Sequence, residues 1–433
     1  MTRPLRLSEQ SLRTTDSPIT ELIYTAMRDR SLISLAAGLV DEETLPTAAV
    51  AQAVAAVLAD PSVGRAALQY GTTAGLGSLR LALAQRLAGD FTQQPTAAAP
   101  LADALAARCI ITSGSQQLLY LVSEALIDPG DIVITESPSY FVYHGVIESF
   151  GARVLGVPMD HEGMSTTALA ELLAELERAG QLHRVKLIYT VDYFQNPTGL
   201  SLSASRRVEL LRLAQQYSRD GRILILEDAA YRDLRYDGSD LPSILSLPGG
   251  EEYVVYAGTF SKPCSPGLKT GYGFLPADLH EPILHLKGNH DFGSSNLSQY
   301  IVAHLLQSGA FDQHLEHLRT TYRRKRDAML EALAETFADC PAVQWNQPAG
   351  GLYVWLEFTD GTRTGPDSPL FRAARQAGVL VVPGEFCHVT TDQDRPRHQL
   401  RLSFGVADPP RLREGVRRLG QAYAQVTKQL QTV

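Results

Sequence analysis

The sequence is short of cysteine and of positive charge, and both shortages exclude classes of protein. Its 4 cysteines among 433 residues are scattered and form no C-x-x-C pair, which argues against a disulfide framework or a zinc knuckle and favours a reducing compartment. Lys and Arg number 39 against 47 Asp and Glu, so the net charge is −8. This charge provides no electrostatic footprint for nucleic acid or for an anionic membrane, and we expect neither as a partner.

A long apolar run and a targeting leader are also missing. The longest apolar stretch, residues 47–59, is alanine-rich and falls short of the roughly 18 residues that a membrane span requires. It predicts a surface helix. The polar N-terminus has no apolar core that leads to a small-residue cleavage site. We therefore expect a soluble, cytoplasmic protein.

The composition and the hydrophobic pattern indicate a globular α/β protein. Hydrophobic residues make up 44% and charged residues 20% of the chain, a balance that excludes wholesale disorder. Short β-branched runs alternate with helical patterns such as 116–126 and 204–217. Such alternation predicts a mostly parallel sheet buried on both faces. The seven runs cover residues 109–112, 132–135, 153–157, 185–189, 223–226, 254–257 and 270–274.

The two ends of the chain have different patterns. Asp16, Ser17 and Pro18 predict a cap and a first-turn proline for a helix over residues 19–28. A long predicted helix over 311–337 precedes shorter strands and a closing helix from 410 to about 430, which suits a smaller α+β domain. The predicted strands cover 343–345, 352–358, 379–382 and 399–403, and residues 93–100 predict a surface loop.

Four short segments follow predicted strands, where open α/β sheets bind their ligands. In the first segment, residues 112–117, small side chains let the backbone N–H groups of Ser115 and Gln116 approach an anion at a helix N-terminus. In the third segment, residues 226–231, Asp228 lies at the end of a strand so apolar that it must be buried. A buried carboxylate is costly unless a cation or a hydrogen-bond donor is its partner. Each segment taken singly also fits an ordinary turn or a solvated loop. The segments cover residues 112–117, 192–199, 226–231 and 258–262, with Lys269 a few residues after the last.

Taken together, the order and spacing of these segments resemble the fold-type I pyridoxal 5′-phosphate (PLP) enzymes, specifically the class I/II aminotransferases. The most similar branch contains 2-aminoadipate and kynurenine aminotransferases and the bodies of MocR regulators. The resemblance extends from Ser34 to Phe404. It implies PLP as cofactor and the fold-type I architecture, in which a large PLP-binding domain carries a mostly parallel seven-stranded sheet. The expected domains are an N-terminal arm over 1–35, the large domain over 36–295 and a small α+β domain over 296–433, to which the arm contributes.

The resemblance assigns roles around the PLP ring. Lys262 would form a Schiff base with the PLP aldehyde, which requires an amine held deprotonated. Asp228 would face the pyridine nitrogen and keep it protonated, so that the ring accepts electrons from the substrate. Tyr140 would stack on the ring face. Asn196 and Tyr231 would hydrogen-bond the phenolic oxygen.

The resemblance also assigns a phosphate site. Tyr70 would reach the phosphate of the neighbouring subunit, which implies a homodimer with shared active sites. Relatives usually have arginine where this chain has Lys269, and a lysine offers a point charge in place of a two-pronged fork. The residues that would hold the phosphate within one subunit are Ser115, Gln116, Thr259, Ser261 and Lys269.

The substrate would be bound mainly by Arg401, whose planar guanidinium suits an α-carboxylate, with Gly38 and Asn196 beside it. Aminoadipate-type relatives can carry an arginine in the N-terminal helix that meets a distal carboxylate. This chain has Thr20 at the matching position. An acidic substrate side chain is therefore less favoured than an apolar or aromatic one.

The implied function is transfer of the α-amino group of an L-amino acid to a 2-oxo acid by a ping-pong mechanism, with Lys262 as general base. One alternative keeps PLP but makes the chain a lyase, decarboxylase or cyclase. Lys269 supports it, as does the stretch 37–40, which differs from the Gly-Gly-Leu-Pro of relatives. A second alternative is a non-catalytic MocR-like sensing body. About 35 residues precede the body here, where those regulators have a basic module of roughly 70.

A metal site has little support. His314 and His317 lie three residues apart in a predicted helix, but no third ligand shares their face. They are interpreted as part of a solvated face, and we expect no metal.

Overall fold

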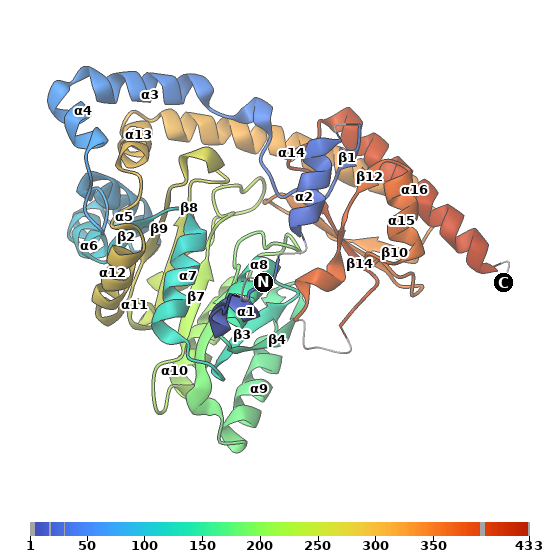
Figure 1. Cartoon of the computed structure of the whole chain (residues 1–433), viewed down its shortest axis with the longest axis horizontal. Helices are drawn as coiled ribbons and strands as arrows, with labels where there is room; N and C mark the ends of the chain where they lie inside the picture. Colours follow the sequence, from blue (N-terminus) through green and yellow to red (C-terminus); the bar gives the residue numbers. More distant parts are fainter. Residues whose placement is uncertain (1–4, 17–18, 30, 390–394, 432–433) are drawn as a thin grey trace.

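An eight-stranded sheet forms the centre of the larger part of the molecule (Figure 1), with the strand order β2-β9-β8-β7-β6-β3-β4-β5. The computed structural model describes residues 5–16, 19–29, 31–389 and 395–431. All seven predicted runs are strands, and the two-residue β5 adds an eighth by pairing antiparallel with the end of β4. The strands are β2 (Cys109–Thr112), β3 (Ile132–Ser137), β4 (Arg153–Asp160), β5 (Gly163–Met164), β6 (Val185–Thr190), β7 (Leu224–Asp228), β8 (Val254–Thr259) and β9 (Gly271–Phe274).

The central strands are parallel and lie between helices, as their continuous apolar sequence predicts. β4, β3, β6, β7 and β8 run parallel, whereas β9 is antiparallel to both β8 and β2. Ile132, Leu187 and Ile225 are fully buried. The helices of this region are α7 (Ser115–Leu126), α8 (Phe141–Ser149), α9 (Thr166–Arg178), α10 (Ala204–Tyr217), α11 (Gly250–Tyr253) and α12 (Ala277–Asp291).

A second, antiparallel sheet with the order β10-β11-β14-β13 lies in the smaller part, at the orange and red end of the chain (Figure 1). The single strand predicted over 379–382 is divided, because β12 pairs with β1 while β13 pairs with β14. The N-terminal segment thus joins the C-terminal part through β1. The elements are β1 (Ile33–Ser34), β10 (Val343–Trp345), β11 (Tyr353–Phe358), β12 (Val379–Leu380), β13 (Val382–Pro383), β14 (Gln399–Ser403), α14 (Ala310–Thr336), α15 (Pro369–Gln376) and α16 (Pro409–Gln431).

The remaining helices lie at the N-terminus and along one side of the large sheet. The predicted helix over 19–28 is α2, while Ser17 and Pro18 of its predicted cap lie outside the described residues. The helices are α1 (Glu9–Arg13), α2 (Ile19–Arg28), α3 (Thr47–Ala59), α4 (Pro61–Leu68), α5 (Gly77–Phe91), α6 (Pro95–Ala107) and α13 (Asn296–Gln307). Short 3₁₀ helices cover Glu42–Thr44, Leu182–Arg184, Ile244–Ser246, Pro266–Leu268 and Gly384–Cys387.

The prediction of a surface loop over 93–100 was wrong, because α6 begins at Pro95. Proline costs nothing at the first helical position, where its missing N–H has no intrahelical partner anyway. The alanines that follow are the strongest helix formers. Ala102 and Leu105 are buried in the core, and α6 packs against α5. Tertiary packing therefore outweighs the second proline, Pro100.

No single helix within the described residues is long and apolar enough to cross a membrane. α3 and α4 together meet the criteria of length and composition, but they are bent by 110° where they meet. The Asp60 carboxylate caps α4 at this bend by accepting hydrogen bonds from the backbone N–H groups of Ser62 and Val63.

Candidate active site

A cavity of about 240 Å³ lies where the parallel strands of the large sheet end. Loops after β2, β3, β6, β7 and β8 form most of its wall, and β11 and β14 of the smaller sheet complete it. Every site residue predicted from the sequence except Tyr70 lines this cavity. They are Gly38, Ser115, Gln116, Tyr140, Asn196, Asp228, Tyr231, Thr259, Ser261, Lys262, Lys269 and Arg401.

Lys262 follows β8 and reaches across the cavity to the N-terminal segment. Its Nζ donates a hydrogen bond to the Gly38 carbonyl oxygen at 2.7 Å. Burial, assisted by the Arg401 guanidinium, lowers the pKa of the Lys262 ammonium. A side chain at Gly38 would not fit, since an added Cβ would lie 2.5 Å from the Tyr353 hydroxyl oxygen. The lowered pKa favours a neutral, nucleophilic amine at Lys262.

Asp228 is the last residue of β7 and is only 4% exposed. The Tyr189 hydroxyl donates to Asp228 Oδ2 at 2.9 Å, and the Ala230 N–H donates to Oδ1 at 3.1 Å. Burial nevertheless raises the pKa of Asp228 to about 6. A cationic N–H placed in the cavity would keep this carboxylate ionised, because an opposite charge favours the charged form.

Arg401 comes from β14 and is 2% exposed. Its Nη1 donates to Asn196 Oδ1 at 2.8 Å, and its Nη2 donates to the Ala36 carbonyl oxygen at 2.7 Å. The guanidinium carbon lies 4.5 Å from the centre of the Tyr353 ring. Nε is buried and has no hydrogen-bond partner among the described residues. A buried donor without a partner is costly, so Nε fits an acceptor supplied by a bound anion.

Three tyrosines surround the centre of the cavity. The Tyr140 hydroxyl donates to Gln116 Oε1 at 3.4 Å, and the hydroxyls of Tyr231 and Tyr353 are 3.1 Å apart. Burial raises the pKa of both Tyr140 and Tyr231, so both keep their protons. Sequence reasoning missed Tyr353, which lies within an ordinary predicted strand and has no local motif to distinguish it.

The opposite end of the cavity is rich in hydrogen-bond donors. Gly114, with φ at +79°, is the N-cap of α7, and the first backbone N–H groups of a helix have no intrahelical partner. Thr259 Oγ1 and Ser261 Oγ are 3.0 Å apart. Lys269 is exposed and has a left-handed backbone, with φ at +49°. A helix N-terminus, hydroxyl groups and an ammonium together suit a phosphate.

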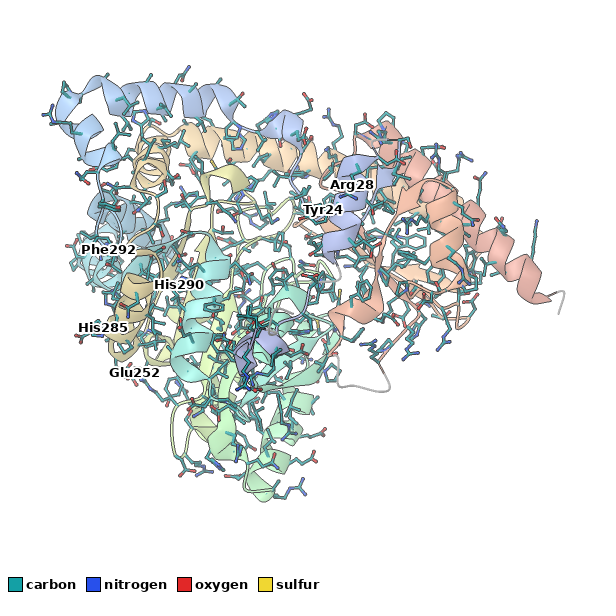
Figure 2. The ribbon with its side chains drawn as sticks, viewed as in Figure 1. Tyr24, Arg28, Glu252, His285, His290 and Phe292 are labelled. Carbon is teal, nitrogen blue, oxygen red and sulfur yellow. The ribbon has the colours of Figure 1, made fainter. Side chains whose placement is uncertain are left out.

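Tyr70 does not reach this cavity in its own subunit. Its side chain is 82% exposed, and its ring meets the ring of Phe292 edge-on at 5.7 Å. Phe292, which follows α12 and is labelled in Figure 2, is 63% exposed. The one predicted site residue outside the cavity is therefore the one expected to act on a neighbouring subunit.

Five apolar side chains that the sequence analysis did not assign also line the cavity and are called its apolar wall below; one of them, Phe141, has its ring centre 5.9 Å from the Arg401 guanidinium carbon. They come from α2, the segment after β1, the start of α8 and the residue after β6, and they are Ile19, Leu39, Phe141, Val142 and Val191. Their signal in the sequence was weak, because each lies at the end of an element whose packing depends on the whole fold. Among the described residues, no group of three His, Cys, Asp or Glu side chains is arranged to hold a metal ion.

The sheet, the lysine after β8 and the aspartate at the end of β7 define a fold-type I PLP-dependent transferase. The family described as aminotransferase class I and II matches residues 30–419. The chain belongs to this family.

Relatives with known names agree with this assignment. An aromatic-amino-acid aminotransferase of Thermococcus litoralis is 34% identical over 97% of this chain and 94% of the relative. A Pyrococcus horikoshii kynurenine aminotransferase structure, determined with PMP, has a TM-score of 0.86 and 31% identity over 97% of both chains. A Thermus thermophilus α-aminoadipate aminotransferase, complexed with N-(5′-phosphopyridoxyl)-L-leucine, has a TM-score of 0.81 and 31% identity over 98% of both chains.

The cavity fits the cofactor of this family. It combines phosphate-type donors at one end, a buried carboxylate for a ring nitrogen, and an amine of lowered pKa between them. The chain is a PLP-dependent aminotransferase.

Proposed function

We propose that this aminotransferase takes its amino group from L-amino acids with apolar or aromatic side chains and passes it to a 2-oxo acid by a ping-pong mechanism. The observation that carries the proposal is the apolar wall of Ile19, Leu39, Phe141, Val142 and Val191, which line the same cavity as Arg401. A carboxylate on the substrate side chain would lose its hydration there without gaining a partner. The names of the relatives, which include an aromatic-amino-acid aminotransferase and a complex with a leucine adduct, support this preference.

Arg401 orients the substrate in this proposal. Its unpartnered Nε would donate to the α-carboxylate, and Asn196 and Ala36 hold the guanidinium in place through the two hydrogen bonds described above. Gly38 leaves room for the substrate because it has no side chain. The buried members of the apolar wall, Phe141 and Val191, would reduce the water around the substrate, which strengthens charge interactions in the cavity.

When bound, PLP supplies a carbonyl carbon for the amino group and a protonated ring that accepts an electron pair. Lys262 would act as general base, because its lowered pKa favours a neutral Nζ that can accept the proton of the substrate Cα. Asp228 would hold the proton at the ring nitrogen. Tyr140 would stack on the ring, and Asn196 and Tyr231 would donate to its phenolic oxygen.

The phosphate of the cofactor would be held at the donor-rich end of the cavity by Ser115, Gln116, Thr259, Ser261 and Lys269. Tyr70 of the partner subunit would complete this site in a homodimer. The exposed Leu58, Leu68 and Phe292 support such an interface, because they accompany Tyr70 as large apolar side chains on the surface of the single chain. We further propose the domain division 1–35, 36–295 and 296–433 and a cytoplasmic location.

The experiment is a spectral titration of the purified holoenzyme with single L-amino acids, combined with detection of the released 2-oxo acid. We expect leucine or phenylalanine to remove the visible band of the lysine-bound cofactor at concentrations about tenfold or more below those needed for aspartate or 2-aminoadipate, because a side-chain carboxylate would be buried unpaired. A preference for the acidic donors would contradict the proposed substrate class.

A Lys262→Ala variant is the control for this titration. It should lack the visible band and release no 2-oxo acid, whereas a variant of an exposed lysine, Lys428→Ala, should keep both. Retention of the band in Lys262→Ala would contradict the role of Lys262.

A further inference from the structure

We propose that Lys287 is a positioning residue for the cofactor phosphate, acting through Asp291 and Gln117 on the loop of residues 113–116. The inference rests on the proposed phosphate role of Ser115 and Gln116. Lys287 lies within α12 and does not line the cavity.

Lys287 is a fully buried ammonium held by a short charge pair. Its side chain is 0% exposed, and Nζ lies 2.7 Å from Asp291 Oδ1 and 2.9 Å from Oδ2. It also donates to Ser294 Oγ at 3.1 Å. Burying such a pair in place of apolar side chains brings little or no net stability. A function in orienting neighbouring groups explains why the charges are there.

One chain of hydrogen bonds leads from the Lys287–Asp291 pair to the loop of residues 113–116, which is called the phosphate loop below. Gln117 Nε2 donates to Asp291 Oδ2 at 2.8 Å, and the Ser113 backbone N–H donates to Gln117 Oε1 at 2.8 Å. The same Nε2 lies 3.3 Å from Nδ1 of His290, which is labelled on α12 in Figure 2. Asp291 therefore fixes the orientation of the Gln117 amide, and the amide in turn fixes Ser113.

A second connection reaches the same residue through Ser294. Its Oγ, which accepts from Lys287, lies 3.3 Å from Ser113 Oγ and 3.4 Å from the Ile111 carbonyl oxygen at the end of β2. Both routes end at Ser113, which itself lines the cavity next to Gly114 and Ser115.

On the side away from the cavity, the loop of residues 113–116 is held by a hydrogen bond and by a close contact with β9. Thr112 Oγ1 donates to the Gly114 carbonyl oxygen at 2.9 Å. Gly271 is so close that an added Cβ would lie 2.4 Å from the Gly114 carbonyl carbon and 2.5 Å from the Ser115 nitrogen. A shift of Ser113 would therefore move the N–H groups at the start of α7.

The molecule contains a matched pair for a control. Lys325 in α14 is 3% exposed and lies 2.5 Å from Asp41 Oδ2. It is also a buried lysine paired with an aspartate, but neither residue lines the cavity or contacts the phosphate loop. Lys287→Met and Lys325→Met remove the same charge from similar surroundings.

The experiment measures the affinity of the cofactor-free protein for PLP and for pyridoxal, which lacks the phosphate. Thermal unfolding and the ³¹P NMR signal of bound PLP are recorded alongside. In Lys287→Met we expect PLP affinity to fall about tenfold or more, the effect of misaligned charge-assisted hydrogen bonds, with pyridoxal affinity nearly unchanged and the ³¹P signal shifted. Lys325→Met should lower the unfolding temperature without changing the ratio of the two affinities.

Gln117→Met provides a second variant that keeps the Lys287–Asp291 pair, in case Lys287→Met does not fold. It should produce the same selective loss of PLP affinity. Equal losses for PLP and pyridoxal in these variants, or an unchanged PLP affinity, would overturn the inference. A wild-type protein that does not distinguish PLP from pyridoxal would instead overturn the phosphate assignments themselves, and the inference with them.

Discussion

At the scale of single residues, burial at the strand ends sets the protonation of several groups. It lowers the pKa of Lys262 and raises the pKa of Asp228 to about 6. Glu136 in β3 is 1% exposed, and burial raises its pKa to about 7 although it accepts hydrogen bonds from Thr190, Val191 and Gln195. Gln195 Nε2 also donates to the Pro138 carbonyl oxygen at 3.0 Å. Glu136 thus joins the segment before Tyr140 to the segment before Asn196.

Glu136 should make the stability of the protein depend on pH. Its folded pKa of about 7 lies above the ordinary value of 4.5, so the folded state binds the proton more tightly. The contribution is fully present at low pH and is lost as the pH rises through 7. Relative to Glu136→Gln, we expect the wild-type free energy of unfolding to fall by roughly 2 kcal/mol between pH 5 and 8, as measured by urea denaturation. An exposed control, Glu171→Gln, should show a constant difference from the wild type. A constant difference for Glu136→Gln would contradict the raised pKa.

At the scale of elements, the structure depends on close approaches between a strand and the start of a helix. The sequence predicted most strands and helices, because continuous apolar runs and helical periodicity are local signals. It failed at α6, where packing against α5 outweighs Pro100 inside the helix, and at 379–382, where one run pairs with two different partners. Pairing partners depend on the whole fold, so a local pattern does not specify them.

Gly271 and Gly273 in β9 offer a matched test of the approach between β9 and α7. In Gly271→Ala the added Cβ would meet the backbone of Gly114 and Ser115, which must move. In Gly273→Ala it would meet the Leu118 side chain at 2.4 Å. We expect both variants to lose about 1–3 kcal/mol of stability from overpacking, but only Gly271→Ala to lose PLP affinity. Chemical denaturation and PLP titration would measure this, and equal PLP affinities would show that the loop tolerates the displacement.

At the scale of the whole molecule, the cavity is assembled from both sheets and from the N-terminal segment. Arg401 comes from β14, Lys262 follows β8, and Gly38 lies shortly after β1. The hydrogen bonds from Lys262 to Gly38 and from Arg401 to Ala36 connect all three regions. Tyr70 remains on the surface, which is consistent with a site completed by a second subunit.

Mixed dimers would test the proposed sharing of the site. Lys262→Ala and Tyr70→Phe subunits should each have little activity alone, the first without its base and the second with a weakened phosphate site. In a mixed dimer, one of the two sites contains both native residues. Random mixing should therefore restore up to about a quarter of wild-type activity per subunit. Activity that never exceeds the sum of the separate variants, or a protein that is monomeric by light scattering, would contradict the shared site.

The sequence by itself determined the succession of strands and helices and the chemistry of the main site residues. Lys262, Asp228, Asn196 and Arg401 were predicted because the order and spacing of their segments resemble those of class I/II aminotransferases, and this order is a property of the chain. The tertiary structure decided which further residues line the cavity, among them Tyr353 and the apolar wall. It also decided the hydrogen bonds by which Lys287 and Glu136 are connected to residues near the cavity. These depend on contacts between residues distant in sequence, whose burial and spacing arise only when the sheets pack together.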